Sequence, residues 1–277
     1  MRKEVKLIAL DLDGTLLTKQ KTITEHTKQV LAQAMKQGVI VMPATGRGVK
    51  AIPEEVSQIE GISYALTVNG AAIVDYKTGQ VIYSDYLDAK TALKALDYGF
   101  TFDALPDVYI DGVAYSEKER FDQVERYMES AFQKEMILKS RIPVDNVREF
   151  VKTHPEKIEK VNIIFRNMED RRIAYEHWEQ DEELTATCSM DNNIELNKKN
   201  VSKGKALIAF AKTIGIEPEE IMVCGDSNND LEMIQMAGLG VAMGNAIEEV
   251  KNVADFITKT NEEDGVAYAI EQFVLKK

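Results

Sequence analysis

The sequence has only two cysteines, Cys188 and Cys224, and they are far apart with no Cys-x-x-Cys spacing. A disulfide framework and a thiolate zinc site are therefore both excluded. No apolar stretch approaches the roughly 20 residues that a membrane-spanning helix needs. No signal peptide is expected ahead of the first apolar run. These absences predict a cytoplasmic protein with no membrane partner.

Basic residues are fewer than acidic ones: the sequence has 34 Lys and Arg and 46 Asp and Glu, which gives a net charge of −12. Binding to nucleic acid or to an anionic membrane surface requires a basic face, so both partners are excluded. The only three histidines, His26, His154 and His177, are scattered and indicate neither a metal cluster nor a catalytic triad. A phosphate ester is still possible as a ligand if a bound cation reverses the local charge.

Two acidic motifs each follow a short apolar run that is typical of a buried parallel strand. Asp11 and Asp13 stand two residues apart and are followed at once by a glycine, and Asp226 and Asp230 follow residues 221–224. Ligands of open α/β sheets bind beyond the carboxyl ends of the strands, where these four acids are expected. Carboxylates beside a phosphate are the oxygen ligands that suit Mg²⁺. The motifs thus predict a magnesium site.

Strands and helices alternate at both ends of the chain, which predicts a Rossmann-like, doubly wound parallel α/β sheet. The pattern changes in the middle, where we expect a second, smaller α/β domain inserted as a cap. The expected division is residues 1–85 and 191–277 for the core and residues 86–190 for the cap. Among the expected elements are helices 24–37, 49–59 and 203–214, a hairpin over 71–84, and a strand over 108–114.

Four motifs occur in order along most of the chain, at Asp11–Thr15, Ala44–Arg47, Ser202–Lys205 and Gly225–Asp230. With these motifs the chain resembles the phosphatases of the haloacid dehalogenase superfamily, of the Cof type with an inserted α/β cap of the C2 type. The resemblance implies a doubly wound core and a hydrolase that acts on small phosphate esters.

A carboxylate can attack phosphorus as a nucleophile, and a second one can transfer protons. The resemblance assigns the first role to Asp11 and the second, as general acid and base, to Asp13. It implies that Mg²⁺ is held by the side chains of Asp11 and Asp226 and by the backbone carbonyl of Asp13, with Asp230 behind them ordering waters or Lys203. It further implies that the phosphate is bound by Leu12, Thr45, Gly46, Lys203 and Asn229.

Two nearby residues could also contact the ligand: Arg47 could reach phosphate or sugar groups, and Asn69 ends a strand near the same edge of the sheet. The plainer interpretations are favoured, Arg47 as a solvated surface residue and Asn69 as part of an Asn-Gly turn. The leading hypothesis is a Mg²⁺-dependent phosphatase for small phosphorylated metabolites such as sugar phosphates, working through an aspartyl-phosphate. The alternatives are a phosphomutase and a non-catalytic regulatory protein that binds a phosphometabolite. The sequence leaves the substrate, the specificity residues of the cap and the oligomeric state open.

Overall fold

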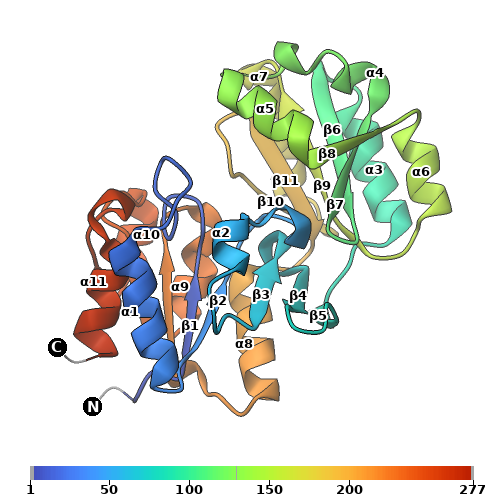
Figure 1. Ribbon diagram of the computed structural model, residues 1–277. Helices are drawn as coiled ribbons and strands as arrows, with labels where there is room; N and C mark the ends of the chain where they lie inside the picture. The colour runs from blue at the N-terminus through green and yellow to red at the C-terminus, as the bar shows by residue number, and fades with distance from the viewer. Residues whose placement is uncertain (1–2, 129, 276–277) are drawn as a thin grey trace. The chain divides into compact units, whose positions relative to one another are not determined.

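The computed structural model describes residues 3–128 and 130–275 (Figure 1). Its contacts divide the chain into two compact units. The first unit contains Met1–Arg47, Ile52–Ser84 and Ser202–Lys277, and the second contains Gly48–Ala51 and Asp85–Val201. The second unit is therefore inserted between two halves of the first.

The first unit is built on a five-stranded sheet in the order β14-β13-β12-β1-β2, and all of its strand pairs are parallel. Three of these strands are buried along their whole length, as is typical of a parallel sheet covered on both faces. The strands are β1 (Leu7–Leu10), β2 (Ile40–Pro43), β12 (Ile221–Gly225), β13 (Leu239–Ala242) and β14 (Phe256–Ile257).

The chain moves through this sheet in two opposite directions. The connection from β1 leads to β2 on one side, whereas β12 leads to β13 and then β14 on the other side. Right-handed crossovers then place α1 on one face and α9 and α10 on the opposite face, and α11 packs beside α1 (Figure 1). The predicted doubly wound sheet is confirmed. Its switch point lies between β1 and β12, where a ligand site is expected.

Local capping signals explain where the two main helices of the first unit begin. The Thr24 side chain accepts a hydrogen bond from the Thr27 N–H at the start of α1, and Ser202 does the same for Lys205 at the start of α8. Both helices were predicted. The helices of this unit are α1 (Glu25–Lys36), α2 (Glu54–Ser57), α8 (Lys203–Thr213), α9 (Leu231–Met236), α10 (Glu248–Val253) and α11 (Gly265–Phe273), with 3₁₀ turns at Val68–Gly70, Pro218–Glu220, Asn228–Asp230 and Asn261–Glu263.

The helix expected over residues 49–59 is wrong, because only a 3₁₀ turn (Val49–Ala51) and the four-residue α2 form there. Pro53 lies between them, and it both lacks an N–H and disfavours helical backbone in the residue before it. The expected hairpin is confirmed. It belongs to a small antiparallel sheet of β3 (Tyr64–Thr67), β4 (Ala72–Asp75) and β5 (Val81–Ser84).

The second unit contains a six-stranded mixed sheet in the order β10-β11-β9-β6-β7-β8. The single strand expected over residues 108–114 is wrong, because the chain turns there at Asp111 and Gly112, both with positive φ, and forms a hairpin. The strands are β6 (Ala104–Ile110), β7 (Val113–Glu117), β8 (Arg141–Val144), β9 (Ile158–Phe165), β10 (Leu184–Thr187) and β11 (Asn193–Lys198).

One face of this second sheet is apolar and packs on helices α3, α6 and α7, with Trp178 in the middle of the core. The helices of this unit are α3 (Ala89–Gly99), α4 (Lys118–Phe121), α5 (Ala131–Ser140), α6 (Val147–Thr153) and α7 (Met168–Glu179), with 3₁₀ turns at Val49–Ala51 and Val124–Arg126. Strand β11 pairs with β9 and β10, so it belongs to this sheet. The chain consequently returns to the first unit at Ser202, later than the boundary expected after residue 190.

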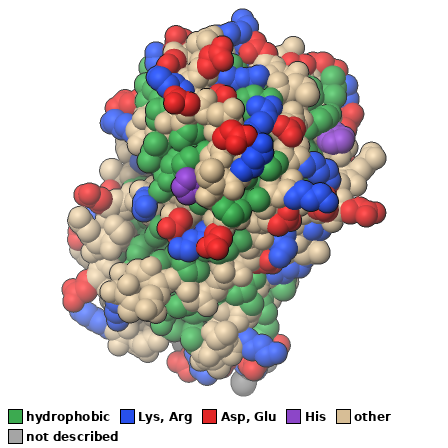
Figure 2. Space-filling model, turned by 90° about the vertical axis from the view of Figure 1, so that its right-hand side faces the viewer, with side chains coloured by type: hydrophobic (Ala, Val, Ile, Leu, Met, Phe, Trp, Pro, Cys, Tyr) green, Lys and Arg blue, Asp and Glu red, His purple; other side chains and the backbone are tan. Residues whose placement is uncertain are grey.

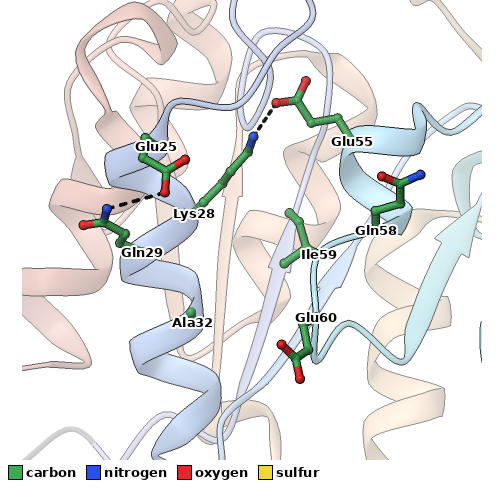
Figure 3. A pocket seen from close by; sticks show the side chains of 8 residues that line it. All are labelled: Glu25, Lys28, Gln29, Ala32, Glu55, Gln58, Ile59 and Glu60. Atoms are coloured by element: carbon green, nitrogen blue, oxygen red, sulfur yellow. Dashed lines mark hydrogen bonds and ion pairs between the residues drawn. The ribbon is translucent and has the colours of Figure 1, made fainter.

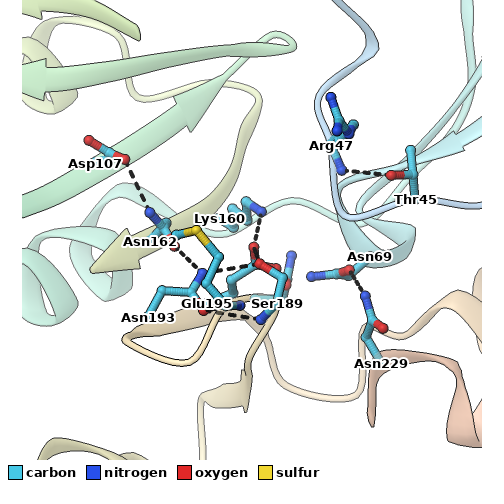
Figure 4. A network of polar contacts seen from close by, with 12 residues as sticks. Thr45, Arg47, Asn69, Asp107, Lys160, Asn162, Ser189, Asn193, Glu195 and Asn229 are labelled. Atoms are coloured by element: carbon cyan, nitrogen blue, oxygen red, sulfur yellow. Dashed lines mark hydrogen bonds and ion pairs between the residues drawn. The ribbon is translucent and has the colours of Figure 1, made fainter. Parts of the chain in front are cut away.

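The other face of the second sheet carries a buried polar network (Figure 4). Asp107, Asn162 and Glu195 lie side by side in register on three neighbouring strands. The Asn162 amide donates to Asp107 (3.1 Å), and Lys160 forms a buried ion pair with Glu195 (2.9 Å). Since buried charges are costly unless they are paired, these bonds let the sheet carry polar residues on a face that water does not reach.

In the described part of the chain, no helix combines the length and the apolar character that crossing a membrane would require. On the molecular face shown in Figure 2, Lys and Arg side chains are interspersed with Asp and Glu side chains.

Candidate active site

The two acidic motifs come together at the switch point of the first sheet. The Asp11 N–H donates to the Cys224 carbonyl (3.0 Å), and the Thr15 hydroxyl donates to Asp226 Oδ1 (3.0 Å). Gly14 makes this approach possible, because its φ is +86° and a Cβ there would lie 2.4 Å from Asp226 Oδ2. The motif glycine is thus required by the contact between two segments that are about 200 residues apart in the chain.

Lys203 is fully buried and bridges the two motifs. Its Nζ lies 2.7 Å from Asp11 Oδ1 and 2.7 Å from Asp230 Oδ1. Burial alone would lower the pKa of this ammonium, but the two carboxylates outweigh it and raise the pKa. Lys203 is therefore a fixed positive charge that holds one oxygen of Asp11 in place.

Asp230 shapes the loop that carries Asp226. Its Oδ2 accepts hydrogen bonds from the backbone N–H groups of Asp226 (3.0 Å) and Ser227 (3.1 Å), while Oδ1 accepts from Lys203. Oxygens of Asp11, Asp226 and Asp230 lie within 4.8 Å of one another, the spacing of a metal site. Because both Asp230 oxygens are already engaged, the carboxylates best able to bind a cation are those of Asp11 and Asp226.

The electrostatics of this cluster favour a cation. Burial raises the pKa of the Asp11 carboxyl well above its usual range, and Asp230 and Asp226 add to this against the opposing Lys203 ammonium. Burial, together with Asp230, also raises the pKa of Asp226 to about 6. Three neighbouring carboxylates share a single ammonium, so negative charge is in excess, and a bound divalent cation would remove that excess.

Asp13 points to a different set of partners. Its carboxylate accepts two hydrogen bonds from the Arg47 guanidinium (2.7 and 2.8 Å) and one from Lys21 (2.6 Å). Burial would raise the pKa of Asp13, but the two cations outweigh it and lower the pKa to about 2. The interpretation of Arg47 as a solvated surface residue is wrong. Its bidentate pair with Asp13 is of the strong, directional type.

The expected phosphate-binding residues surround this centre on several loops. Thr45 is buried just after β2, its N–H donates to Leu66 (2.9 Å), and its hydroxyl accepts from the Arg47 N–H (3.1 Å). Gly46 lies between these two residues. The Leu12 side chain is buried and its carbonyl accepts from Leu17 (2.8 Å). This leaves the Leu12 N–H as the group with which that residue could bind a phosphate oxygen.

Asn229 is brought to the same loops by an unexpected partner. Its Nδ2 donates to Oδ1 of the buried Asn69 (3.1 Å), as Figure 4 shows. The interpretation of Asn69 as a plain turn residue missed this contact, because an Asn-Gly pair before a strand is a common hairpin signal. The available clue was its place at the end of a strand that follows the second motif.

A separate groove in the first unit lies between α1 and α2, with a volume of about 430 Å³ (Figure 3). Three of its eight lining residues are glutamates, and one of them, Glu55, pairs with Lys28 (2.7 Å). None of the expected site residues lines it. An acidic groove of this kind would repel a phosphate ester, so it is not the site that the motifs predict.

Comparison with known proteins assigns the chain to a family. The haloacid dehalogenase-like hydrolase family matches residues 8–270. The chain belongs to this family. It is 30% identical to the phosphatase YwpJ of Bacillus subtilis, over 98% of this chain and all of that protein. It is 31% identical to the 5-amino-6-(5-phospho-D-ribitylamino)uracil phosphatase YcsE of the same organism, over 98% and 97% of the two chains.

Among solved structures, a haloacid dehalogenase-like hydrolase from B. subtilis aligns with a TM-score of 0.85 and 30% identity, over 98% of this chain and all of that one. The match covers both units of the chain. The resemblance stated from the four motifs is therefore confirmed. This member of the haloacid dehalogenase-like family is a phosphatase, a hydrolase that acts on phosphorylated substrates.

Proposed function

We propose that this haloacid dehalogenase-like hydrolase is a Mg²⁺-dependent phosphatase of small phosphorylated metabolites and that it works through an aspartyl-phosphate on Asp11. One observation carries the proposal: a buried ammonium, Lys203, holds Oδ1 of Asp11 at 2.7 Å at the switch point of the sheet. This fixes the carboxylate and leaves Oδ2 to attack phosphorus. A phosphoryl-transfer site needs this kind of positioning more than it needs elaborate chemistry.

The reaction follows in two steps. Asp11 Oδ2 forms a bond to phosphorus while the bond from phosphorus to the ester oxygen breaks, and Asp13 gives the leaving oxygen its proton. Water then attacks the phosphoryl group on Asp11, Asp13 takes a proton from it, and inorganic phosphate leaves. With Arg47 and Lys21 paired to it, Asp13 is a carboxylate, as the second step requires. We infer that substrate binding loosens these pairs so that Asp13 can carry a proton in the first step.

The proposed cation is Mg²⁺. The side chains of Asp11 and Asp226 and the backbone carbonyl of Asp13 would hold it, and such oxygen donors suit a hard ion that also keeps waters. When bound, it would neutralise the phosphate charge and so let one anion approach another. Thr45, Gly46, Leu12, Lys203 and Asn229 would bind the phosphoryl oxygens, and Asp230 would hold Lys203 and the Asp226 loop.

For the substrate we propose a phosphomonoester of a sugar or sugar alcohol. The support comes from relatives: YcsE, and YwtE of B. subtilis at 32% identity, are both named as phosphatases of 5-amino-6-(5-phospho-D-ribitylamino)uracil. That compound carries its phosphate on a ribityl chain. The cytoplasmic location predicted from the sequence would give the enzyme access to such metabolites.

The experiment is phosphate release from p-nitrophenyl phosphate and from a panel of sugar and polyol phosphates, with Mg²⁺ and with excess chelator. We expect release that needs the metal and is lost in Asp11→Asn, and mass spectrometry of the quenched wild type should find one added phosphoryl group. Asp191→Asn, at an exposed aspartate, is the matched control and should keep full activity. Conversion of a hexose 1-phosphate to its 6-phosphate would favour a mutase, and binding of phosphate without release would favour a regulatory protein.

A further inference from the structure

The turn at Val68–Gly70 has an unusual backbone. Its three residues have φ values of +50°, +59° and +100°. A left-handed conformation is rare for a β-branched residue such as Val68 and persists only where the surrounding structure imposes it. Asn69, by contrast, belongs to a residue type that tolerates this conformation. The turn is therefore held in place by its neighbours.

Those neighbours are the loops that carry the motifs. The Val68 N–H donates to the Arg47 carbonyl (3.0 Å), and the Asn69 N–H donates to the Thr45 carbonyl (3.1 Å). On the other side, Gly70 lies so close to the start of α8 that a Cβ would be 2.3 Å from the Ser202 carbonyl oxygen. The turn thus packs closely between the second motif and the helix that begins with Lys203.

From this fixed turn the Asn69 side chain reaches the fourth motif. Its Oδ1 accepts a hydrogen bond from Asn229 Nδ2 (3.1 Å), and the Oδ1 of Asn229 accepts one from the Ser227 hydroxyl (2.9 Å). Figure 4 shows the first of these bonds. Together the two bonds fix the rotation of the Asn229 amide. An amide nitrogen carries two hydrogens, so one N–H of Asn229 stays available in a defined direction.

We infer that Asn69 is a positioning residue that aims the second Nδ2–H of Asn229 at an oxygen of the transferred phosphoryl group. This rests on the proposed function, which gives Asn229 a phosphate-binding role. An amide that can rotate freely presents either its oxygen or its nitrogen to the phosphate, and the oxygen would repel it. By accepting from one N–H, Asn69 excludes the wrong orientation, and the strained turn places Asn69 where it can do so.

The test is a double-mutant cycle with Asn69→Gly and Asn229→Ala. Glycine keeps the left-handed backbone and removes the side chain that carries the acceptor. We expect Asn69→Gly to lower kcat/KM about tenfold, mainly through kcat, and Asn229→Ala about a hundredfold. The double variant should be no worse than Asn229→Ala within about twofold, because Asn69 acts only through Asn229. Asn200→Gly, at another left-handed asparagine, should keep full activity.

The same cycle is measured as binding of inorganic phosphate, which does not depend on turnover. The inference is supported if Asn69→Gly lowers the affinity for phosphate when Asn229 is present but not when it is alanine. This result would stand even if no substrate is hydrolysed, and in that case only the proposed function fails. Three results would overturn the inference. The first is a double variant whose loss equals the product of the two single losses. The others are an Asn69→Gly variant with wild-type binding and kcat, and a wild type that binds no phosphate. A thermal melt of every variant checks that the fold is intact.

Discussion

Glu159, on strand β9 of the second unit, makes the stability of that unit depend on pH. Its side chain is only 4% exposed and accepts a hydrogen bond from the Gly112 N–H (3.1 Å). Burial raises the pKa of this carboxyl from its ordinary 4.5 to about 7, although the Gly112 bond and Lys160 oppose the shift. The folded protein therefore binds this proton more tightly than the unfolded chain does.

The direction and size of the effect follow from this difference. Between about pH 4.5 and 7 the folded state holds more protons than the unfolded state, so stability falls as pH rises through this window and is level above it. A raised carboxyl pKa thus contributes stability below pH 4.5 that is lost above pH 7. The difference between 4.5 and about 7 corresponds to about 3 kcal/mol. Glu159→Gln removes the ionisation and keeps an acceptor for Gly112.

We expect the variant to exceed the wild type in free energy of unfolding by about 1 kcal/mol at pH 5 and by about 3 kcal/mol at pH 8. Urea titrations followed by Trp178 fluorescence measure this, since the only tryptophan is 1% exposed in the core of the same unit. Glu182→Gln, at an exposed position, is the control and should leave the free energy of unfolding close to that of the wild type. A constant difference for Glu159→Gln, or a variant less stable than the wild type at pH 8, would refute the reasoning.

Two further predictions concern the first unit. Gly14→Ala and Gly38→Ala both place alanine at a positive φ, which by itself should lower the free energy of unfolding by about 1–2 kcal/mol. Only Gly14→Ala should also abolish phosphate release, because its new Cβ displaces Asp226, whereas a Cβ at Gly38 would have nothing within 4 Å. Equal rates of phosphate release from the two variants would contradict this. Lys203→Met leaves buried carboxylates unpaired and should cost about 3–5 kcal/mol by calorimetry. The half-exposed Lys205→Met should cost less than about 1 kcal/mol, and similar losses for both would contradict the assignment.

Local patterns were sufficient for much of the core. Capping residues such as Thr24 and Ser202 predicted the starts of α1 and α8, and the apolar runs ahead of Asp11 and Asp226 predicted parallel strands. These predictions succeed because a cap or a buried strand is decided by residues a few positions apart. The helix expected over residues 49–59 failed for a local reason as well, since the restriction imposed by Pro53 was not weighed.

Contacts between distant segments could not be predicted in this way. Arg47 pairs with a carboxylate 34 residues away, and Asn69 meets an amide 160 residues away. Each side chain is ambiguous by itself, because arginine is common at surfaces and Asn-Gly is common in turns. Strand β11 fell within residues 191–277, the range expected for the core, for a related reason, since an apolar and polar alternation does not specify which strand it pairs with.

The sequence by itself determined the chemistry available to this protein: acids at the ends of two apolar strands, a lysine at the start of a helix, and no cysteine or histidine site to compete with them. Only the tertiary structure decided how these groups divide their roles. It engages both oxygens of Asp230 and turns Asp13 toward Arg47 and Lys21, which leaves Asp11 and Asp226 facing each other. The reason is physical, because residue type fixes what a side chain can bind, whereas partners across the fold fix which of its atoms are free and what charge it carries.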